Sequence, residues 1–326
     1  MSDLPKIVYF GSDAICLPGL EYLRLHCRER CELHAVVSQP DRPQGRGRKL
    51  QANPVAAWAK ANDIELLQPD KPGRELAEWM AAEQVRLALV MAYGHFLPKA
   101  VREAPMHGML NFHGSLLPQY RGASPVETAL AEGEAETGVC LMAVAKEMDA
   151  GAVADCERVA ITAEDTGPSL RAKIGDAVVP LIQRQLDAML CGQLDWTEQD
   201  AGAATFCRKI GKEDGGLDFS LPARRLHCRM RAFTPWPGAY FDHEDHRIKV
   251  GRAEWDNAAT SAVPGTVLKA GDSLTVATGE GRLRLLELQR AGGRMLPTSD
   301  FLRGYPIAEG QILKGGKVTP LLRKQP

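Results

Sequence analysis

An asparagine and a histidine stand two residues apart in segment 110–122, which reads Leu-Asn-Phe-His-Gly-Ser-Leu-Leu-Pro-Gln-Tyr-Arg-Gly. The short apolar run around them predicts a buried strand, so the side chains of Asn111 and His113 leave its end on the same face. An amide can donate a hydrogen bond to an oxyanion, and an imidazole can donate or accept a proton. The pair therefore indicates chemistry at a carbonyl group. A lone Asn-x-His is more often an ordinary strand end whose histidine is already hydrogen-bonded.

The longer string favours the chemical interpretation. Gly114, Pro118 and Gly122 interrupt regular structure, so this backbone is expected to wrap around a ligand. Residues 111–118 and 120–125 closely resemble the signature of the folate-dependent formyltransferases, and among them most resemble the methionyl-tRNA formyltransferases. The resemblance implies a catalytic triplet of Asn111, His113 and Asp149, and a folate pocket shaped by the backbone of Ser115, Leu116, Leu117 and Pro118.

The resemblance is looser around Asp149. The family usually carries Asp-Thr-Gly-Asp at this point, whereas residues 149–152 read Asp-Ala-Gly-Ala. The carboxylate is present, but its neighbours differ, so the sequence leaves open how the Asp149 loop is hydrogen-bonded.

The reaction that the resemblance implies transfers a formyl group from 10-formyltetrahydrofolate to the α-amino group of initiator methionyl-tRNA, in support of translation initiation. Only a neutral amine attacks, and an α-amino group has an ordinary pKa of about 7.7–8.0, so modest help with deprotonation suffices. We expect Asp149 to be the base, directly or through a water, and to hold His113 in its useful protonation state. Asn111 and protonated His113 would stabilise the oxyanion. The scheme needs no covalent intermediate and no metal.

A second segment, residues 38–50, indicates contact with phosphate. It holds the basic residues Arg42, Arg46, Arg48 and Lys49 together with two prolines and two glycines. Nothing in it can bury an apolar face, so a mobile loop is predicted, and its guanidinium groups suit phosphate oxygens. The methionyl-tRNA formyltransferases carry a similar basic loop that inserts against the tRNA acceptor end, and Arg42 and Lys49 match its basic positions. On composition alone, a merely solvated loop is the alternative.

The first half of the chain predicts an α/β domain. Strands are expected near residues 6–10, 32–37, 64–67, 87–91 and 138–144, with helices between them near 18–28, 54–62 and 73–84 and a long helix at about 165–190. This alternation predicts a Rossmann-like, mostly parallel sheet over residues 1–190, with ligands beyond the carboxyl ends of its strands. Tyr93 and Gly94 follow such a strand, so we expect them to line the folate crevice. The Gly-x-Gly-x-x-Gly dinucleotide fingerprint is absent.

The second half differs in pattern and charge. Residues 191–205 read as a polar linker, and short alternating runs over 206–315 predict a small antiparallel barrel like those of oligonucleotide-binding domains. Residues 316–326 are expected to be a frayed tail. Residues 1–205 hold 20 basic and 28 acidic groups, a balance of −8, whereas residues 206–326 hold 20 and 13, a balance of +7. The basic half suits a polyanion, which the resemblance identifies as tRNA.

Composition excludes some classes of protein. With 326 residues, 44% hydrophobic and 25% charged, the chain is ordinary for a globular protein of two domains. No apolar run reaches membrane-spanning length and no signal peptide is recognised, so a cytoplasmic protein without an obligate protein partner is expected. The eight cysteines lack paired spacing and are expected to be free thiols. Cys27-x3-Cys31-x2-His34 lacks a second pair of zinc ligands.

Three alternatives remain open. A sibling transferase could formylate glycinamide ribonucleotide or an amino sugar, but it would not need the basic loop. A formylfolate hydrolase could use the same Asn, His and Asp on water, without a polyanion surface. A tRNA-binding protein without activity would keep the charge but has no reason to combine Asn111, His113 and Asp149.

Overall fold

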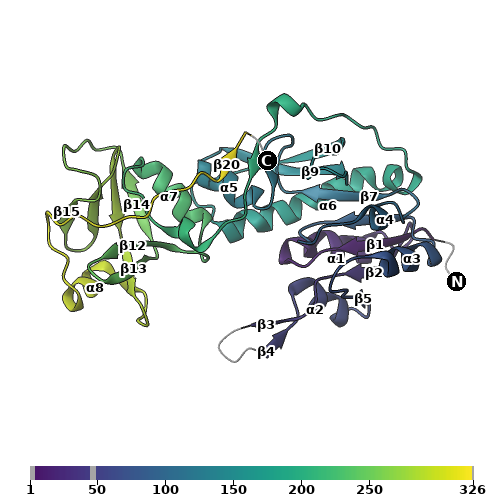
Figure 1. Ribbon diagram of the computed structural model, residues 1–326, viewed down its shortest axis with the longest axis horizontal. Helices are drawn as coiled ribbons and strands as arrows, with labels where there is room; N and C mark the ends of the chain where they lie inside the picture. The colour runs from purple at the N-terminus through teal and green to yellow at the C-terminus, as the bar shows by residue number, and fades with distance from the viewer. Residues whose placement is uncertain (1–3, 45–48, 325–326) are drawn as a thin grey trace.

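Alternating strands and helices from the first half of the chain build one seven-stranded sheet. The computed structural model describes residues 4–44 and 49–324, and forms two lobes along its longest axis (Figure 1). The sheet has the order β10-β9-β7-β6-β1-β2-β5, in which the five strands from β7 to β5 are parallel and β9 and β10 are antiparallel. The strands are β1 (Lys6–Phe10), β2 (Glu32–Val37), β5 (Glu65–Leu67), β6 (Leu87–Val90), β7 (Met109–His113), β9 (Glu136–Ala143) and β10 (Val153–Ala160). The predicted mostly parallel sheet is confirmed.

Helices cover both faces of this sheet. One core holds apolar residues of α1 (Leu17–His26), α2 (Pro54–Ala61), α5 (Pro125–Glu132) and α6 (Gly167–Cys191); the other holds those of α3 (Arg74–Ala82) and α4 (Lys99–Arg102). All four residues of β6 are buried, as expected for a strand covered on both faces. Local sequence sets the helix starts. Asn53 accepts hydrogen bonds from the amides of Val55 and Ala56 at the start of α2, and a capping box of Thr166 and Ser169 begins α6.

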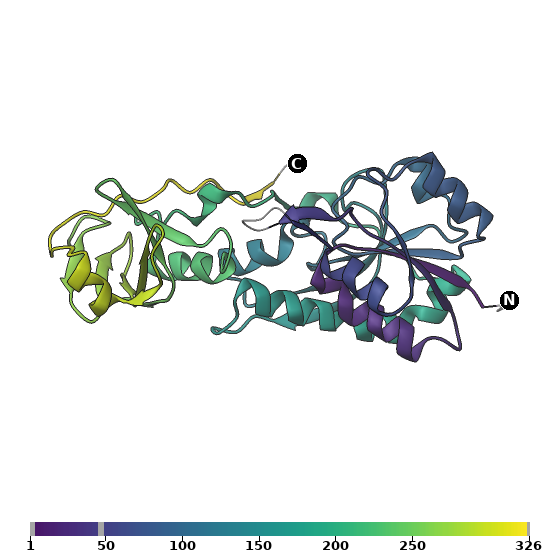
Figure 2. The same ribbon diagram turned by 90° about the horizontal axis from the view of Figure 1, so that it is seen from below.

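Segments far apart in sequence meet in a small third sheet beside the main one. Its strands, in the order β20-β11-β8, are β20 (Leu322–Arg323), β11 (Phe206–Cys207) and β8 (Arg121–Gly122). The yellow end of the chain runs back from the C-terminal lobe to the N-terminal lobe in both views (Figures 1 and 2). Leu321 is fully buried in the core of the first half. The prediction of a frayed tail is therefore wrong for the described residues 316–324, because an apolar side chain and a strand anchor them.

The basic segment 38–50 also has more order than predicted. Strands β3 (Arg42–Gln44) and β4 (Lys49–Gln51) pair antiparallel, with Arg42 opposite Gln51 and Gln44 opposite Lys49. Backbone pairing makes a hairpin without an apolar face, which a pattern of side chains does not reveal. Arg46 and Arg48 lie outside the described residues.

The C-terminal lobe contains two four-stranded sheets whose strands pair antiparallel, as predicted. One, in the order β12-β13-β18-β19, and the other, in the order β14-β17-β16-β15, enclose a core of their own. The strands are β12 (Ala239–His243), β13 (His246–Val250), β14 (Ala253–Asp256), β15 (Val267–Ala270), β16 (Leu274–Ala277), β17 (Arg282–Leu285), β18 (Glu287–Arg290) and β19 (Leu296–Pro297). Strand pairing among the described residues does not close these sheets into the barrel that we expected.

Three features of this lobe differ from the sequence pattern. The alternating run 282–288 is divided at Leu286, whose amide donates to the carbonyl oxygen of Arg252, and the chain then enters the other sheet. Helices α7 (Ala223–Ala232) and α8 (Thr298–Gly304) were not expected. Five of the ten residues of α7 are buried hydrophobics or alanines, but four basic residues obscure their spacing in the sequence. The described residues also form three short 3-10 helices, η1 (Ala14–Cys16), η2 (Ala201–Ala203) and η3 (Lys212–Gly215).

Two cysteines are not free. Cys140 and Cys156 form a disulfide, because they lie directly opposite each other in the β9–β10 ladder, with Cα atoms 4.1 Å apart. The other six cysteines are free thiols, as predicted. Among residues 4–44 and 49–324, no group of three or more His, Cys, Asp or Glu is placed to hold a metal ion. No helix in these residues is long and apolar enough to cross a membrane.

Candidate active site

The end of β7 presents Asn111 and His113. Register pairs Asn111 with Met142 and His113 with Cys140 of β9, so the strand holds both backbones firmly. Leu110 and Phe112 point into one core and Met109 into the other, which puts Asn111 and His113 together on the face opposite to Leu110. The Asn111 amide makes no hydrogen bond to any residue that the structure describes. It is partly exposed, so it is available to a ligand.

The imidazole of His113 is buried between a carbonyl oxygen and a carboxylate. Its Nε2 lies 2.9 Å from the carbonyl oxygen of Tyr120, which can only accept, so Nε2 carries a hydrogen. Its Nδ1 lies 3.7 Å from Oδ2 of Asp149. In the neutral ring Nδ1 is therefore an acceptor facing a carboxylate oxygen. A proton between these two atoms would be attracted by both.

Asp149 is fixed by backbone groups. It has a left-handed φ of 51°, and its Oδ2 accepts a hydrogen bond of 2.8 Å from the amide of Gly122. A Cβ on Gly151 would lie 1.9 Å from the carbonyl oxygen of Ala143, so only glycine fits there. The side chain of Gln199 donates to the carbonyl oxygens of Asp149 and Gly151, at 2.9 and 2.6 Å. These contacts answer how the Asp-Ala-Gly-Ala loop is held, and none involves a side chain at position 150 or 152.

The loop that follows His113 in the chain contains the residues expected to shape the folate pocket. The Ser115 side chain is fully buried and donates to the carbonyl oxygen of Gln119 at 2.6 Å, so it shapes the loop rather than facing a ligand. Leu116, Leu117 and Pro118 are partly exposed. The amide of Leu117 lies 3.4 Å from Sγ of Cys140, which ties the loop to β9.

Tyr93 does not present its ring to the crevice. It is 2% exposed and packs edge-on against Phe10, with ring centroids 5.4 Å apart. Burial raises the pKa of Tyr93 to about 12. Its carbonyl oxygen accepts from Gln39 at 2.7 Å, and Gly94 follows with a φ of 76°. The ring of Tyr93 is therefore not available for the expected contact with folate. Only the backbone of Tyr93 and Gly94 is left to make it.

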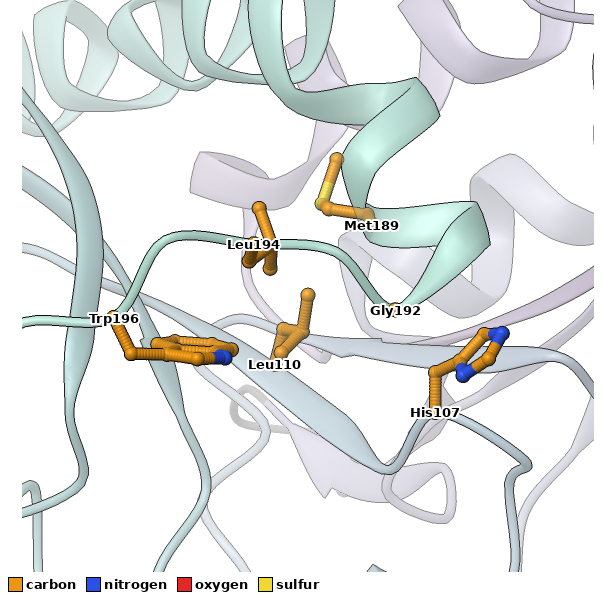
Figure 3. A pocket seen from close by; sticks show the side chains of 6 residues that line it. All are labelled: His107, Leu110, Met189, Gly192, Leu194 and Trp196. Atoms are coloured by element: carbon orange, nitrogen blue, oxygen red, sulfur yellow. The ribbon is translucent and has the colours of Figure 1, made fainter.

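A separate pocket of about 140 Å³ lies at the opposite end of β7 (Figure 3). Leu110, from the other face of the strand, forms its floor between the rings of His107 and Trp196. Nε2 of His107 is buried and has no hydrogen-bond partner among the described residues. Asn111, His113 and Asp149 do not line this pocket, so it is not the place of the predicted chemistry.

Sequence reasoning missed two side chains of the site. Arg121 is 7% exposed and donates from Nε and Nη2 to Oε1 of Gln199, at 2.9 and 2.7 Å. Its guanidinium carbon lies 5.8 Å from the ring centroid of Phe206. Arg121 stands within the matched motif, which was a usable signal. Gln199 stands in a polar segment that carries no signal.

Comparison with known proteins identifies the family. The model of the formyl transferase family matches residues 6–185, and that of its C-terminal domain matches residues 209–306. The chain belongs to the formyl transferase family. It is 40% identical over 312 residues to the methionyl-tRNA formyltransferase of Myxococcus xanthus, covering 94% of this chain and 97% of the relative. It is 42% identical over 292 residues to that of Delftia acidovorans, covering 86% and 89%.

A solved formyltransferase has the same fold. The N-formyltransferase of Helicobacter canadensis, in complex with folinic acid and dTDP-3-aminofucose, matches with a TM-score of 0.65 over 88% of this chain and 99% of that one. At 16% identity this likeness concerns the fold alone.

Proposed function

We propose that this formyl transferase moves the formyl group of 10-formyltetrahydrofolate to the α-amino group of initiator methionyl-tRNA. The observation that carries the proposal is the match, along nearly the whole chain, to relatives named methionyl-tRNA formyltransferase at about 40% identity. Both lobes are included in that match. A match to the catalytic half alone would not indicate which amine receives the formyl group.

Asp149 and His113 together take the proton that the attacking amine loses. Nδ1 and Oδ2 face each other at 3.7 Å, so an amine N–H brought to this gap meets two acceptors. The Tyr120 carbonyl holds the ring with Nδ1 toward the gap. Asp149 keeps its position because the Gly122 amide fixes the same Oδ2. Positioned proton transfer of this kind contributes roughly 10²–10⁴ in rate.

Asn111 stabilises the oxyanion. Both nitrogens of His113 are directed at protein acceptors, which leaves a protonated ring no free N–H for the substrate. We therefore assign the donor role to the amide of Asn111 alone, whereas the sequence suggested that protonated His113 shares it. The amide of Asn111 can donate to an oxyanion without first breaking a hydrogen bond, because it makes none to any described residue.

Formyltetrahydrofolate enters as a co-substrate beside Leu116, Leu117 and Pro118. These residues are partly exposed and follow His113 closely in the chain. The hydrogen bond from the Ser115 side chain to the carbonyl oxygen of Gln119 fixes the loop that contains them. We expect the backbone at Tyr93 and Gly94, in the segment that follows β6, to border the folate as well. The folinic acid named with the Helicobacter canadensis enzyme supports a folate ligand on this fold.

The tRNA is held by charge. Arg42 is exposed on the β3–β4 hairpin, which extends from the N-terminal lobe toward the C-terminal lobe in both views (Figures 1 and 2). Lys49 stands on its other strand, and the sequence of the basic segment also contains Arg46 and Arg48, outside the described residues. The C-terminal lobe adds a pocket of about 400 Å³ with Arg290, Arg294 and Tyr305 in its wall. Arginine and an aromatic ring suit phosphate and base.

The proposal assigns a role to each part of the chain. Residues 1–190 are the catalytic domain, 191–205 the linker and 206–315 the tRNA-binding domain, followed by the tail 316–326. The two C-terminal sheets act as an oligonucleotide-binding surface.

The test is formyl transfer from 10-formyltetrahydrofolate to purified initiator methionyl-tRNA. The controls are uncharged tRNA, elongator methionyl-tRNA and glycinamide ribonucleotide. Transfer to the charged initiator alone supports the proposal. Folate turnover that is indifferent to tRNA contradicts it and identifies a hydrolase, and transfer to the ribonucleotide identifies a sibling transferase.

A further inference from the structure

One side chain of the linker makes four hydrogen bonds inside the active site. Oε1 of Gln199 accepts two from Arg121, and its Nε2 donates to the carbonyl oxygens of Asp149 and Gly151, all at 2.6–2.9 Å. These partners are 78, 50 and 48 residues away in sequence. An amide offers one oxygen and two N–H groups, so all its donors and its acceptor are in use.

Strand β8 (Arg121–Gly122) also contacts Asp149 directly. Arg121, whose side chain binds Gln199, precedes Gly122, whose amide binds Oδ2 of Asp149. Strand β8 is in turn paired parallel with β11. The Gln199 bonds fix the backbone of Asp149, and the Gly122 bond fixes its carboxylate.

The residues after Gln199 reinforce this arrangement. The amide of Arg121 donates to the carbonyl oxygen of Thr205 at 2.9 Å, and the amide of Tyr120 to Oγ1 of the same residue at 2.9 Å. Tyr120 is the residue whose carbonyl orients His113. The segment that joins the two lobes is therefore a wall of the active site as well as a tether.

We propose that Gln199 is a positioning residue for Asp149, and that through it the linker sets the geometry of proton transfer. The inference rests on the proposed function, since it assumes that Asp149 takes the proton. Asp149 has a left-handed φ and lies in the loop between β9 and β10, where Gln199 donates to its carbonyl oxygen and the amide of Ala150 lies 3.4 Å from the carbonyl oxygen of Glu147. A shift of about 1 Å at a reacting group can lower a rate by about 10²-fold.

The experiment compares Gln199→Glu, Gln199→Met and a control, Gln193→Met, in the full chain. Glu keeps an acceptor for Arg121 but cannot donate to the carbonyls of Asp149 and Gly151. Met has a similar length and removes both functions. Gln193 is exposed in the same segment, and its side chain has no hydrogen bond within the described part of the chain. The readouts are kcat, KM for each substrate and the thermal midpoint.

We expect Gln199→Glu to lower kcat about 10–100-fold with a KM for methionyl-tRNA within about twofold and an almost unchanged thermal midpoint. Gln199→Met should lower kcat similarly and also lower the midpoint, because Arg121 loses its partner. Gln193→Met should match the wild type. A wild-type kcat in Gln199→Glu overturns the proposal, since only the bond to Arg121 then matters.

Two other outcomes also decide it. A raised KM with unchanged kcat, or failure of both Gln199 variants to fold, overturns the positioning role. The activity of the wild type distinguishes failure of the Gln199 role from failure of the proposed function. If the wild type fails to formylate methionyl-tRNA, the proposed function fails; if it succeeds while the variants equal it, only the role of Gln199 fails.

Discussion

The two lobes solve different physical problems. In the N-terminal lobe the candidate site consists of buried or backbone-held groups, such as His113, whose Nε2 is hydrogen-bonded to the carbonyl oxygen of Tyr120 and whose Nδ1 faces Asp149. The second half of the chain, residues 206–326, carries a surplus of +7, and the C-terminal lobe keeps arginines such as Arg294 exposed. Chemistry needs a few groups at fixed distances, whereas attraction of a polyanion needs many exposed charges at loose distances. The first lobe should therefore govern kcat, and basic exposed residues should govern KM for tRNA.

Chain order and spatial order do not coincide in this division. The tail belongs to the second half by sequence, but Leu321 is buried in the core of the first. Arg208 donates to the carbonyl oxygens of Thr319 and Pro320 and so fixes the tail along its path. Mutations in the linker and tail should behave like mutations of the catalytic lobe.

The sharpest test of the division is Asp149→Asn. Asparagine tolerates the left-handed backbone and still accepts from the Gly122 amide, so the fold should persist while the charge is lost. We expect kcat to fall by roughly 10²–10⁴ with KM for tRNA unchanged. Steady-state formylation measures both, and a kcat above one tenth of the wild type would remove Asp149 from the mechanism.

Asn111→Ala should have the next largest effect. Its amide has no partner among the described residues, so removal should cost little stability, but about 10²–10³ in kcat as an oxyanion donor. The thermal midpoint serves as the control for folding. A loss confined to KM for formyltetrahydrofolate would instead make Asn111 a binding residue.

Leu321→Ala tests where the tail belongs. Deleting most of a fully buried leucine should lower the free energy of unfolding by about 2–5 kcal/mol, and the first half should report it. Denaturant unfolding measures this, with Leu50→Ala as the matched control because Leu50 is 71% exposed. Equal stabilities of the two variants would mean that the tail is not anchored.

Asp165→Asn tests the carboxylate that lies just before the start of α6. Burial raises the pKa of Asp165, but hydrogen bonds from Lys173, Thr162 and Ser169 outweigh burial and lower the pKa to about 2. The carbonyl of Asp165 also accepts from Arg231 of α7. Because the folded pKa lies below the unfolded one, this stabilisation exists above about pH 4 and is lost as pH falls toward 2.

The variant should therefore lose on the order of 2 kcal/mol of unfolding free energy near neutral pH and nothing near pH 2. Denaturant titrations across this pH range measure the difference. A difference independent of pH would exclude the ionised carboxylate as its source.

Arg42→Gln should have the smallest effect and should leave kcat unchanged. Losing one exposed phosphate contact should raise KM for methionyl-tRNA a few-fold and reduce the slope of log affinity against log salt by about 1. Arg74→Gln is the control, because Arg74 is 87% exposed on α3, far along the chain from the hairpin. Identical salt slopes for both variants would exclude a specific role of the hairpin.

Local patterns in the sequence determined much of this protein. Apolar runs placed β1, β2 and β7 because strands of a covered parallel sheet must be apolar on both faces, and the two-residue spacing of Asn111 and His113 set their common face. The apolar run 138–144 likewise marked most of β9. The charge balance of each half also needs no coordinates.

Only the tertiary structure decided which distant groups meet. The disulfide depends on the β9–β10 register, which puts Cys140 opposite Cys156. The burial of Leu321 depends on where the returning chain meets the first core. Gln199 reaches Asp149 only because β11 brings the linker alongside β8. A polar side chain gains its hydrogen-bond partners from the folded arrangement rather than from its neighbours in sequence, so its position in a polar segment could not reveal them.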